Sequence, residues 1–172
     1  MVVARIVSGG QTGVDRAALD VAMELGLEAG GWCPKGRRAE DGIIPARYPL
    51  QETDSKAYRT RTRFNVGDSD ATLVLMRGVP RGGTAYTVEC ARKLRRPFLV
   101  VDVTGAADAE AVRAWLGETG ARTLNVAGPR ESGAPGIGTE AKALLRAVFG
   151  PRGSIQPSQP KRLLRRSRPS SP

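Results

Sequence analysis

Apolar residues along this chain fall into two alternating patterns. Short continuous apolar runs are typical of strands covered on both faces of a parallel sheet, whereas apolar residues three and four apart form the buried stripe of a helix. The runs occupy residues 2–8, 71–76, 98–103 and 123–127, and the stripes occupy residues 14–25, 83–95, 108–118 and 141–149. This alternation predicts one doubly wound α/β domain with a mostly parallel central sheet.

The first helix has the clearest predicted ends. Thr12 is placed to be its N-cap, and Asp15 puts an acid in the first turn, where the helix dipole favours a negative charge. As an alternative to this role in the helix, Asp15 would pair with Arg16 or bond a hydroxyl or amine of a ligand. Gly26 is suited to end the helix. The stretch after it, residues 30–53, is less regular and predicts a strand followed by a long loop.

The positive charge is unevenly distributed. The 172 residues carry a formal net charge of +10, but residues 151–172 contain six basic residues and no acid. Residues 1–150 then hold 21 basic and 17 acidic residues, a net charge of +4. We therefore expect a folded ligand-binding domain over residues 1–150 and a disordered Pro/Ser/Arg-rich tail over residues 151–172. The folded domain is not expected to bind nucleic acid, and the basic tail is the one segment through which the chain would do so.

The rare residue types exclude several classes of chemistry. Histidine is absent, so Ser-His-Asp and Cys-His catalysis and the commonest zinc sites are excluded, and no metal bound by protein side chains is expected. The two cysteines, Cys33 and Cys90, lie outside any metal-ligand spacing, as expected in a reducing cytoplasm. No apolar run approaches the roughly 20 residues that span a bilayer, so no membrane association is expected.

Four glycine-bearing segments follow predicted strands, and the carboxyl ends of parallel strands share the edge of the sheet where ligands bind. They span residues 8–13, 33–42, 77–84 and 127–138. Helix N-termini after such loops attract anions, and glycine lets the backbone approach a ligand closely. The same segments carry basic residues: Lys35, Arg37, Arg38, Arg77, Arg81 and Arg130. The combination predicts a phosphate-bearing anionic ligand, although a tight strand-to-helix turn would by itself explain the glycines of residues 8–13.

Five segments in order resemble the molybdenum cofactor carrier proteins: "GGQTGVDRAAL", "GGWCPKGRRAEDG", "YRTRTRFNVGDSDATLVL", "RGGTAYT" and "LNVAGPRESGAPGI". The resemblance runs from about residue 6 to residue 149. It implies a Rossmann-like domain, commonly a homo-oligomer, that binds an anionic pterin phosphate such as molybdenum cofactor without transforming it. The wider superfamily binds nucleotides and includes the cytokinin-activating phosphoribohydrolases, the "lysine decarboxylase-like" proteins.

The phosphoribohydrolases have the pattern P-G-G-x-G-T-x-x-E and an upstream arginine. Gly82, Gly83 and Glu89 match the pattern, and Arg61 matches the arginine, while the sequence departs from it at Arg81, Ala85 and Tyr86. Similarity to these enzymes therefore implies an alternative function, hydrolysis of the N-glycosidic bond of nucleoside 5′-monophosphates, with Arg61 and Glu89 catalytic. Glu89 would otherwise be a solvated helix residue or an ion-pair partner of Arg61.

The principal hypothesis is a cytoplasmic carrier of molybdenum cofactor or a nucleotide derivative. Backbone amides of two glycine loops would hold its phosphate, four cations would neutralise its charge, and two threonine hydroxyls would add donors. The expected ligand-binding residues are Gly9, Gly10, Gln11, Thr12, Gly13, Lys35, Arg61, Arg81, Gly82, Gly83, Thr84 and Arg130.

Overall fold

Each of the four apolar runs contains one strand of a single parallel sheet, and a fifth strand lies outside these runs. The computed structural model describes residues 3–105 and 107–151. The sheet contains β1 (Arg5–Val7), β2 (Glu28–Gly30), β7 (Ala71–Met76), β8 (Phe98–Asp102) and β9 (Thr123–Ala127). They pair in the order β2-β1-β9-β7-β8, and every pairing is parallel. The predicted doubly wound α/β architecture is therefore present. β9 lies between β1 and β7, which both precede it in the chain.

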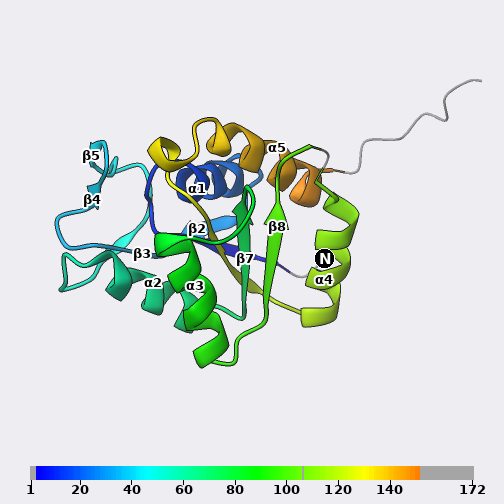
Figure 1. Ribbon diagram of the computed structural model, residues 1–172, viewed down its shortest axis with the longest axis horizontal. Coiled ribbons are helices and arrows are strands. Elements are labelled where there is room, and N and C mark those ends of the chain that lie inside the picture. The colour runs from blue at the N-terminus through cyan, green and yellow to red at the C-terminus, as the bar shows by residue number, and fades with distance from the viewer. Residues whose placement is uncertain (1–2, 106, 152–172) are drawn as a thin grey trace, which may run out of the picture.

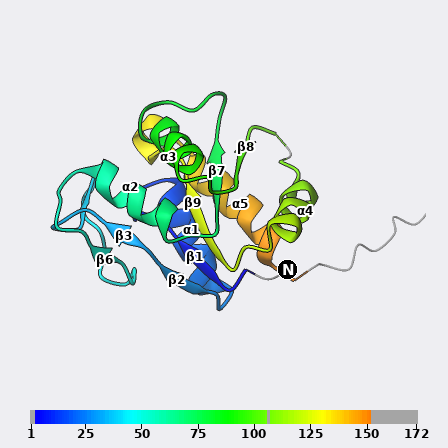
Figure 2. The ribbon, with the colours of Figure 1, turned by 90° about the horizontal axis from the view of Figure 1, so that it is seen from below.

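Helices cover both faces of this sheet (Figures 1 and 2). The described residues form five α-helices: α1 (Val14–Glu24), α2 (Tyr58–Gly67), α3 (Gly82–Lys93), α4 (Ala109–Thr119) and α5 (Ile137–Phe149). α1 packs against α5, which also contacts α4, while α2 packs against α3 on the opposite face. Four of these helices match the predicted stripes, and α2 was not predicted.

The central strand β7 shows how one sequence pattern supports both layers. Its six residues are all buried, as expected for a strand covered on both faces. Leu73 and Leu75 pack into the large core with α1 and α5, whereas Val74 and Met76 pack with Val88 of α3. The alternation follows from the period of two along a strand. By contrast, β8 lies at the sheet edge and is only half-buried, so full cover on both faces was wrongly expected there.

The irregular region between β2 and α2 contains four two-residue strands: β3 (Trp32–Cys33), β4 (Arg38–Ala39), β5 (Gly42–Ile43) and β6 (Gln51–Glu52). β3 pairs with β6 in parallel, and β4 and β5 form an antiparallel hairpin at the outer end of the molecule (Figure 1). The loop between β5 and β6 is held by Arg37, whose guanidinium donates to four backbone carbonyl groups, those of Ile44, Pro45, Tyr48 and Leu50. Arg37 therefore packs this loop, although the sequence grouped it with cations that would face a ligand.

The basic tail predicted over residues 151–172 lies, apart from Pro151, outside the described residues. No helix in the described part of the chain is long and apolar enough to cross a membrane.

Candidate functional site

Loops from neighbouring strands meet at the carboxyl edge of the sheet, as the topology requires. The loop after β1 contacts the strand and loop at β9: the Ser8 hydroxyl donates to the Val126 carbonyl at 2.6 Å, and the Val14 amide donates to the Pro129 carbonyl at 3.3 Å. The loop after β7 reaches the same region, where Arg77 donates to the Pro135 carbonyl at 3.0 Å. These three of the four predicted glycine segments are therefore contiguous at this edge, and the fourth, residues 33–42, joins them through Glu40.

The glycines of the first loop are covered by protein atoms. A Cβ at Gly9 would lie 1.7 Å from Nη1 of Arg61, so any larger residue here would push this guanidinium aside. Gly13 has a φ of 76°, and a Cβ there would lie 2.5 Å from the carbonyl oxygen of Pro129. Two amides of this loop also have partners inside the protein, since Gln11 donates to the Asp15 carboxylate and Thr12 to the Gln11 side chain. The geometry here is largely that of a closely packed turn.

The start of α1 differs from the prediction. The residue before its first turn is Gly13, and no side chain caps the helix. Thr12 is not the N-cap because its hydroxyl is engaged across the site, where it accepts from the Glu131 amide at 3.1 Å and donates to Glu40. The alternative pairing of Asp15 with Arg16 is also wrong. Arg16 makes two hydrogen bonds to Asp41, at 2.6 and 2.7 Å.

Asp15 pairs instead with Arg61 of α2. Arg61 Nη1 donates to Asp15 Oδ2 at 3.1 Å, and the two side chains are 14% and 3% exposed. Burial raises the pKa of Asp15, and the Arg61 charge and the Gln11 amide oppose that rise. The Nε of Arg61 is buried and has no hydrogen-bond partner among residues 3–105 and 107–151. The pair connects α2 to the first turn of α1, directly beneath the first glycine loop.

A second carboxylate, that of Glu40 on the β4–β5 hairpin, connects three loops. Its oxygens accept from the Thr12 hydroxyl, the Ser132 hydroxyl and the Ser132 amide, the last at 3.1 Å. Arg130 Nε lies 3.4 Å away. These hydrogen bonds lower the pKa of Glu40, and the one from the Ser132 hydroxyl has the largest effect. The carboxylate is therefore ionised at neutral pH. Sequence analysis missed Glu40 and Ser132, although the acids of "AEDG" within a basic segment were a visible signal.

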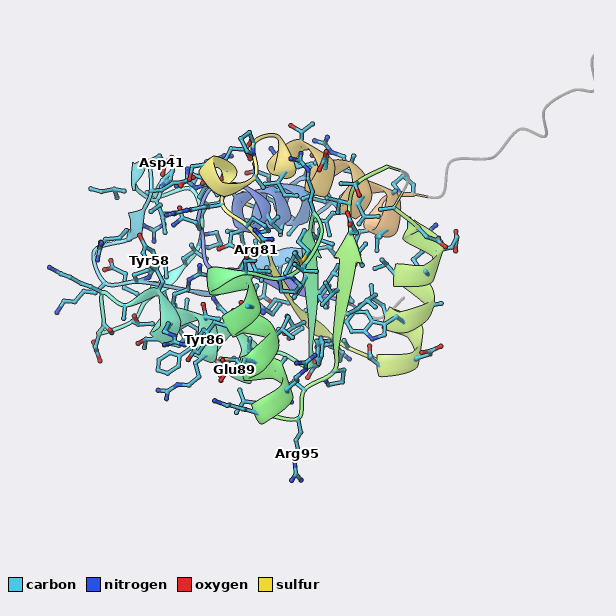
Figure 3. The ribbon with its side chains drawn as sticks, in the orientation of Figure 1. Asp41, Tyr58, Arg81, Tyr86, Glu89 and Arg95 are labelled. Carbon is cyan, nitrogen blue, oxygen red and sulfur yellow. The ribbon has the colours of Figure 1, made fainter. Side chains whose placement is uncertain are left out.

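The second helix start at this edge, that of α3, is open. Arg81, Gly82 and Gly83 are exposed, and a Cβ at either glycine would meet no described atom within 4 Å. No side chain caps the helix, and the described residues of its first turn include no acid. Thr84 is buried, with its amide bonded to the Arg81 carbonyl at 3.1 Å. Figure 3 shows Arg81 at this end of α3.

The remaining predicted residues lie apart from this open helix start. Lys35 is exposed, and its amide donates to the Ser55 carbonyl at 2.9 Å. Glu89 is half-exposed further along α3, near Tyr86 in Figure 3, and pairs with Lys93 at 2.6 Å. That hydrogen bond lowers the pKa of Glu89. Of the two alternatives for Glu89, the ion pair with Arg61 is wrong, because each residue has a different partner, and the half-exposed helix residue agrees with the structure.

Two surface cavities lie away from the glycine loops. One, of about 130 Å³, is lined by Arg5, Trp32, Asn65, Asp68 and their neighbours. The other, of about 280 Å³, lies between α5 and the connection from β8 to α4. Within the described residues, no group of three or more acids and cysteines is placed to hold a metal ion.

Comparison with known proteins gives consistent results for family and fold. The model of the circularly permutated YpsA SLOG family matches residues 6–149. The crystal structure of a "Putative molybdenum carrier protein" from Syntrophus aciditrophicus SB is 39% identical in sequence, with a TM-score of 0.82. The alignment covers 86% of this chain and 96% of that one. No curated protein matches the chain. The resemblance seen in the sequence and the Rossmann-like fold class are thereby confirmed.

Proposed function

We propose, since the chain belongs to the circularly permutated YpsA SLOG family, that it binds and carries an anionic, phosphate-bearing small molecule. Family membership and the structural neighbour support a ligand-binding role. The neighbour's description as a molybdenum carrier favours molybdenum cofactor as the ligand, and a nucleotide derivative is the other candidate.

The observation that carries this proposal is the open N-terminus of α3. The first amides of a helix have no intrahelical acceptor and lie at the positive end of the helix dipole, so they attract phosphate. Gly82 and Gly83 leave these amides uncovered, and Arg81 adds a cation beside them. In α1, by contrast, the carboxylate of Asp15 already occupies the first turn. We assign the phosphate to residues 81–84. Lys35 and Arg130, which lie apart from this helix start, would contact other parts of the ligand.

The donors at this edge suit the phosphate of molybdenum cofactor better than its metal. Backbone amides, guanidinium groups and hydroxyls bind oxyanions and offer molybdenum no soft ligand. Cys33 is fully buried and Cys90 nearly so, and burial raises the pKa of the Cys33 thiol. The cargo would therefore be held by its phosphate.

Binding without turnover is favoured over hydrolysis. The hydrolase alternative requires Arg61 and Glu89 to act on one substrate. Arg61 is held by Asp15 beneath the first glycine loop, and Glu89 is held by Lys93 on an exposed part of α3. Incubation with AMP at high protein concentration provides the test, and release of free adenine above background would favour the enzyme.

The binding experiment is a thermal unfolding titration with molybdenum cofactor, AMP and inorganic phosphate. A ligand at 100 times its Kd stabilises the folded state by about 2.7 kcal/mol. Gly83→Asp places an acid in the first turn of α3, which the helix dipole tolerates, and we expect it to abolish binding without loss of stability. Ala111→Asp, in the first turn of α4, adds the same charge elsewhere and should bind normally. Equal ligand binding by Gly83→Asp and the unmutated protein would contradict the assignment.

The family resemblance further implies a cytoplasmic homo-oligomer, and we include both in the proposal. Light scattering coupled to size-exclusion chromatography tests the assembly, and a mass equal to one chain at all concentrations would contradict it.

A further inference from the structure

The donors around Glu40 form a recognisable oxyanion site. Two hydroxyls, one backbone amide and one guanidinium converge on its carboxylate from two loops. Thr12 comes from the loop after β1, and Arg130 and Ser132 come from the loop after β9. These loops leave the Glu40 side chain 16% exposed, although the residue as a whole is exposed. Several donors from separate segments around one anion are the arrangement by which proteins bind phosphate.

The Glu40 carboxylate fills this site, and the β4–β5 hairpin that carries it makes few apolar contacts with the rest of the protein. The β4–β5 hairpin has two residues in each strand, and Ile43 at its end is 75% exposed. Ala39 packs against the apolar cluster that contains Leu19 and Ile44. The other attachments are polar: the Glu40 amide donates to Gln11 at 2.9 Å, and Asp41 binds Arg16. Partly exposed polar contacts each contribute little net free energy, because water competes for the same groups. A ligand of moderate affinity can therefore displace the hairpin.

We propose that Glu40 is an internal substitute for the ligand, and that a phosphate group or similar tetrahedral oxyanion displaces it from Thr12, Arg130 and Ser132. The inference rests on the proposed function and adds a second oxyanion subsite, separate from the start of α3. Its consequence is that the β4–β5 hairpin is released when the subsite fills. The Asp41–Arg16 pair then remains as the tether of the hairpin.

Competition by Glu40 lowers the apparent affinity of this subsite, because the ligand binds only the fraction of molecules in which Glu40 has left. Glu131, the other carboxylate nearby, does not compete in the same way. It accepts from the amides of Gly136 and Gly138 at the start of α5. Removal of the Glu40 charge alone should therefore expose the subsite.

The test is calorimetric titration of Glu40→Gln with inorganic phosphate and, separately, with molybdate. We expect at least about tenfold tighter phosphate binding than in the unmutated protein. Asp41→Asn is the matched control, since it removes the same charge from the same hairpin without vacating the donors; it loosens one attachment of the hairpin and should gain clearly less affinity than Glu40→Gln. Adding Ser132→Ala to Glu40→Gln removes one donor and should cancel the gain. Equal or weaker binding by Glu40→Gln overturns the inference.

Measurement on the unmutated protein keeps the test independent of the variant's stability. Arg38 is exposed at the start of the hairpin, so trypsin cleavage after it, followed by mass spectrometry, reports hairpin release. Phosphate should accelerate this cleavage at least about threefold relative to an equal concentration of chloride, because local opening exposes the site. Unchanged or slower cleavage overturns the inference.

The outcomes separate the two proposals. If the ligand binds and Gly83→Asp abolishes that binding, but Glu40→Gln shows no gain, the proposed function stands and the second subsite is excluded. If Glu40→Gln gains phosphate affinity and phosphate accelerates cleavage of the unmutated protein, but molybdenum cofactor and AMP do not bind, the subsite stands and the carrier function fails.

Discussion

Replacement of Arg61 by Met should destabilise the protein in a strongly pH-dependent way. The change removes the charge that faces Asp15 and keeps much of the side-chain volume. Asp15 is 3% exposed, so water cannot replace the lost partner. Breaking a buried ion pair by removing one member typically costs about 3–5 kcal/mol, since the other charge stays buried and unpaired.

Protonation of Asp15 sets an upper limit on the loss of stability, because a protonated Asp15 no longer needs a charged partner. An aspartate has a pKa near 3.9 in the unfolded chain, so keeping it protonated in the folded state costs about 1.36 kcal/mol per pH unit above that value. The bound is about 4 kcal/mol at pH 7 and about 1.5 kcal/mol at pH 5. The pKa of Asp15 is raised in the folded state. The contribution of Asp15 to the free energy of unfolding is therefore present at low pH and is lost as the pH rises through its folded pKa.

Urea unfolding followed by circular dichroism at pH 5, 6, 7 and 8 measures this dependence. Arg61→Met should lose about 3–4 kcal/mol at pH 7 and clearly less at pH 5. The double variant Arg61→Met/Asp15→Asn should recover most of that loss and show little pH dependence between pH 5 and 8. Arg59→Met, on the same helix but exposed and stacked over the Tyr86 ring, is the matched control and should change stability by less than about 1 kcal/mol. A loss of the same size at pH 5 and pH 8 would refute the reasoning.

Three further predictions follow from individual contacts. Gly9→Ala should cost about 3 kcal/mol in urea unfolding, since its Cβ would displace the Arg61 guanidinium from Asp15, and a change below about 0.5 kcal/mol would contradict this. Arg37→Met should cost about 1–3 kcal/mol and increase amide exchange in residues 44–50, because four carbonyls lose their donor; unchanged exchange there would be evidence against it. The amides of Thr123 and Arg122 lower the pKa of Asp70 in the folded state. The ionised Asp70 therefore stabilises the fold at pH values above its unfolded pKa, and this stabilisation is lost as the pH falls through its folded pKa. Asp70→Asn should therefore flatten the acid side of the stability–pH curve, and an unaltered acid side would exclude that role.

Most of the sheet and four helices were predictable because apolar burial is periodic along the chain. α2 was not, since its buried residues include the polar Thr62 and Asn65. It is anchored by polar contacts instead: the Asn65 amide group accepts from the Trp32 backbone amide at 2.7 Å and donates to the Trp32 carbonyl at 3.0 Å. Hydrogen bonds of this kind leave no periodic pattern in the sequence, so hydrophobic spacing cannot reveal the helix.

The positions of the glycine loops at the site were predictable, but the pairing of charges among them was not. Strand ends determine where loops lie, and strand ends follow from the apolar runs. The Thr12–Glu40 and Asp15–Arg61 contacts join residues 28 and 46 positions apart. The chain has 27 basic and 17 acidic residues, so charge alone permits many alternative pairs. Only the three-dimensional path of the chain selects among them.

The two glycine-bearing helix starts nevertheless differ in a way that the sequence contains. In "GGQTGVD" an acid follows the glycines within the first turn of α1, whereas in "RGGTAYTVE" the next acid is Glu89, two turns into α3. A carboxylate in the first turn can take the backbone donors that an external anion would need, and Asp15 does so with the Gln11 amide. The helix start without such a residue leaves its donors free for the phosphate that we propose. The position of the first acid after a glycine loop therefore distinguishes the closed turn at α1 from the proposed anion site at α3.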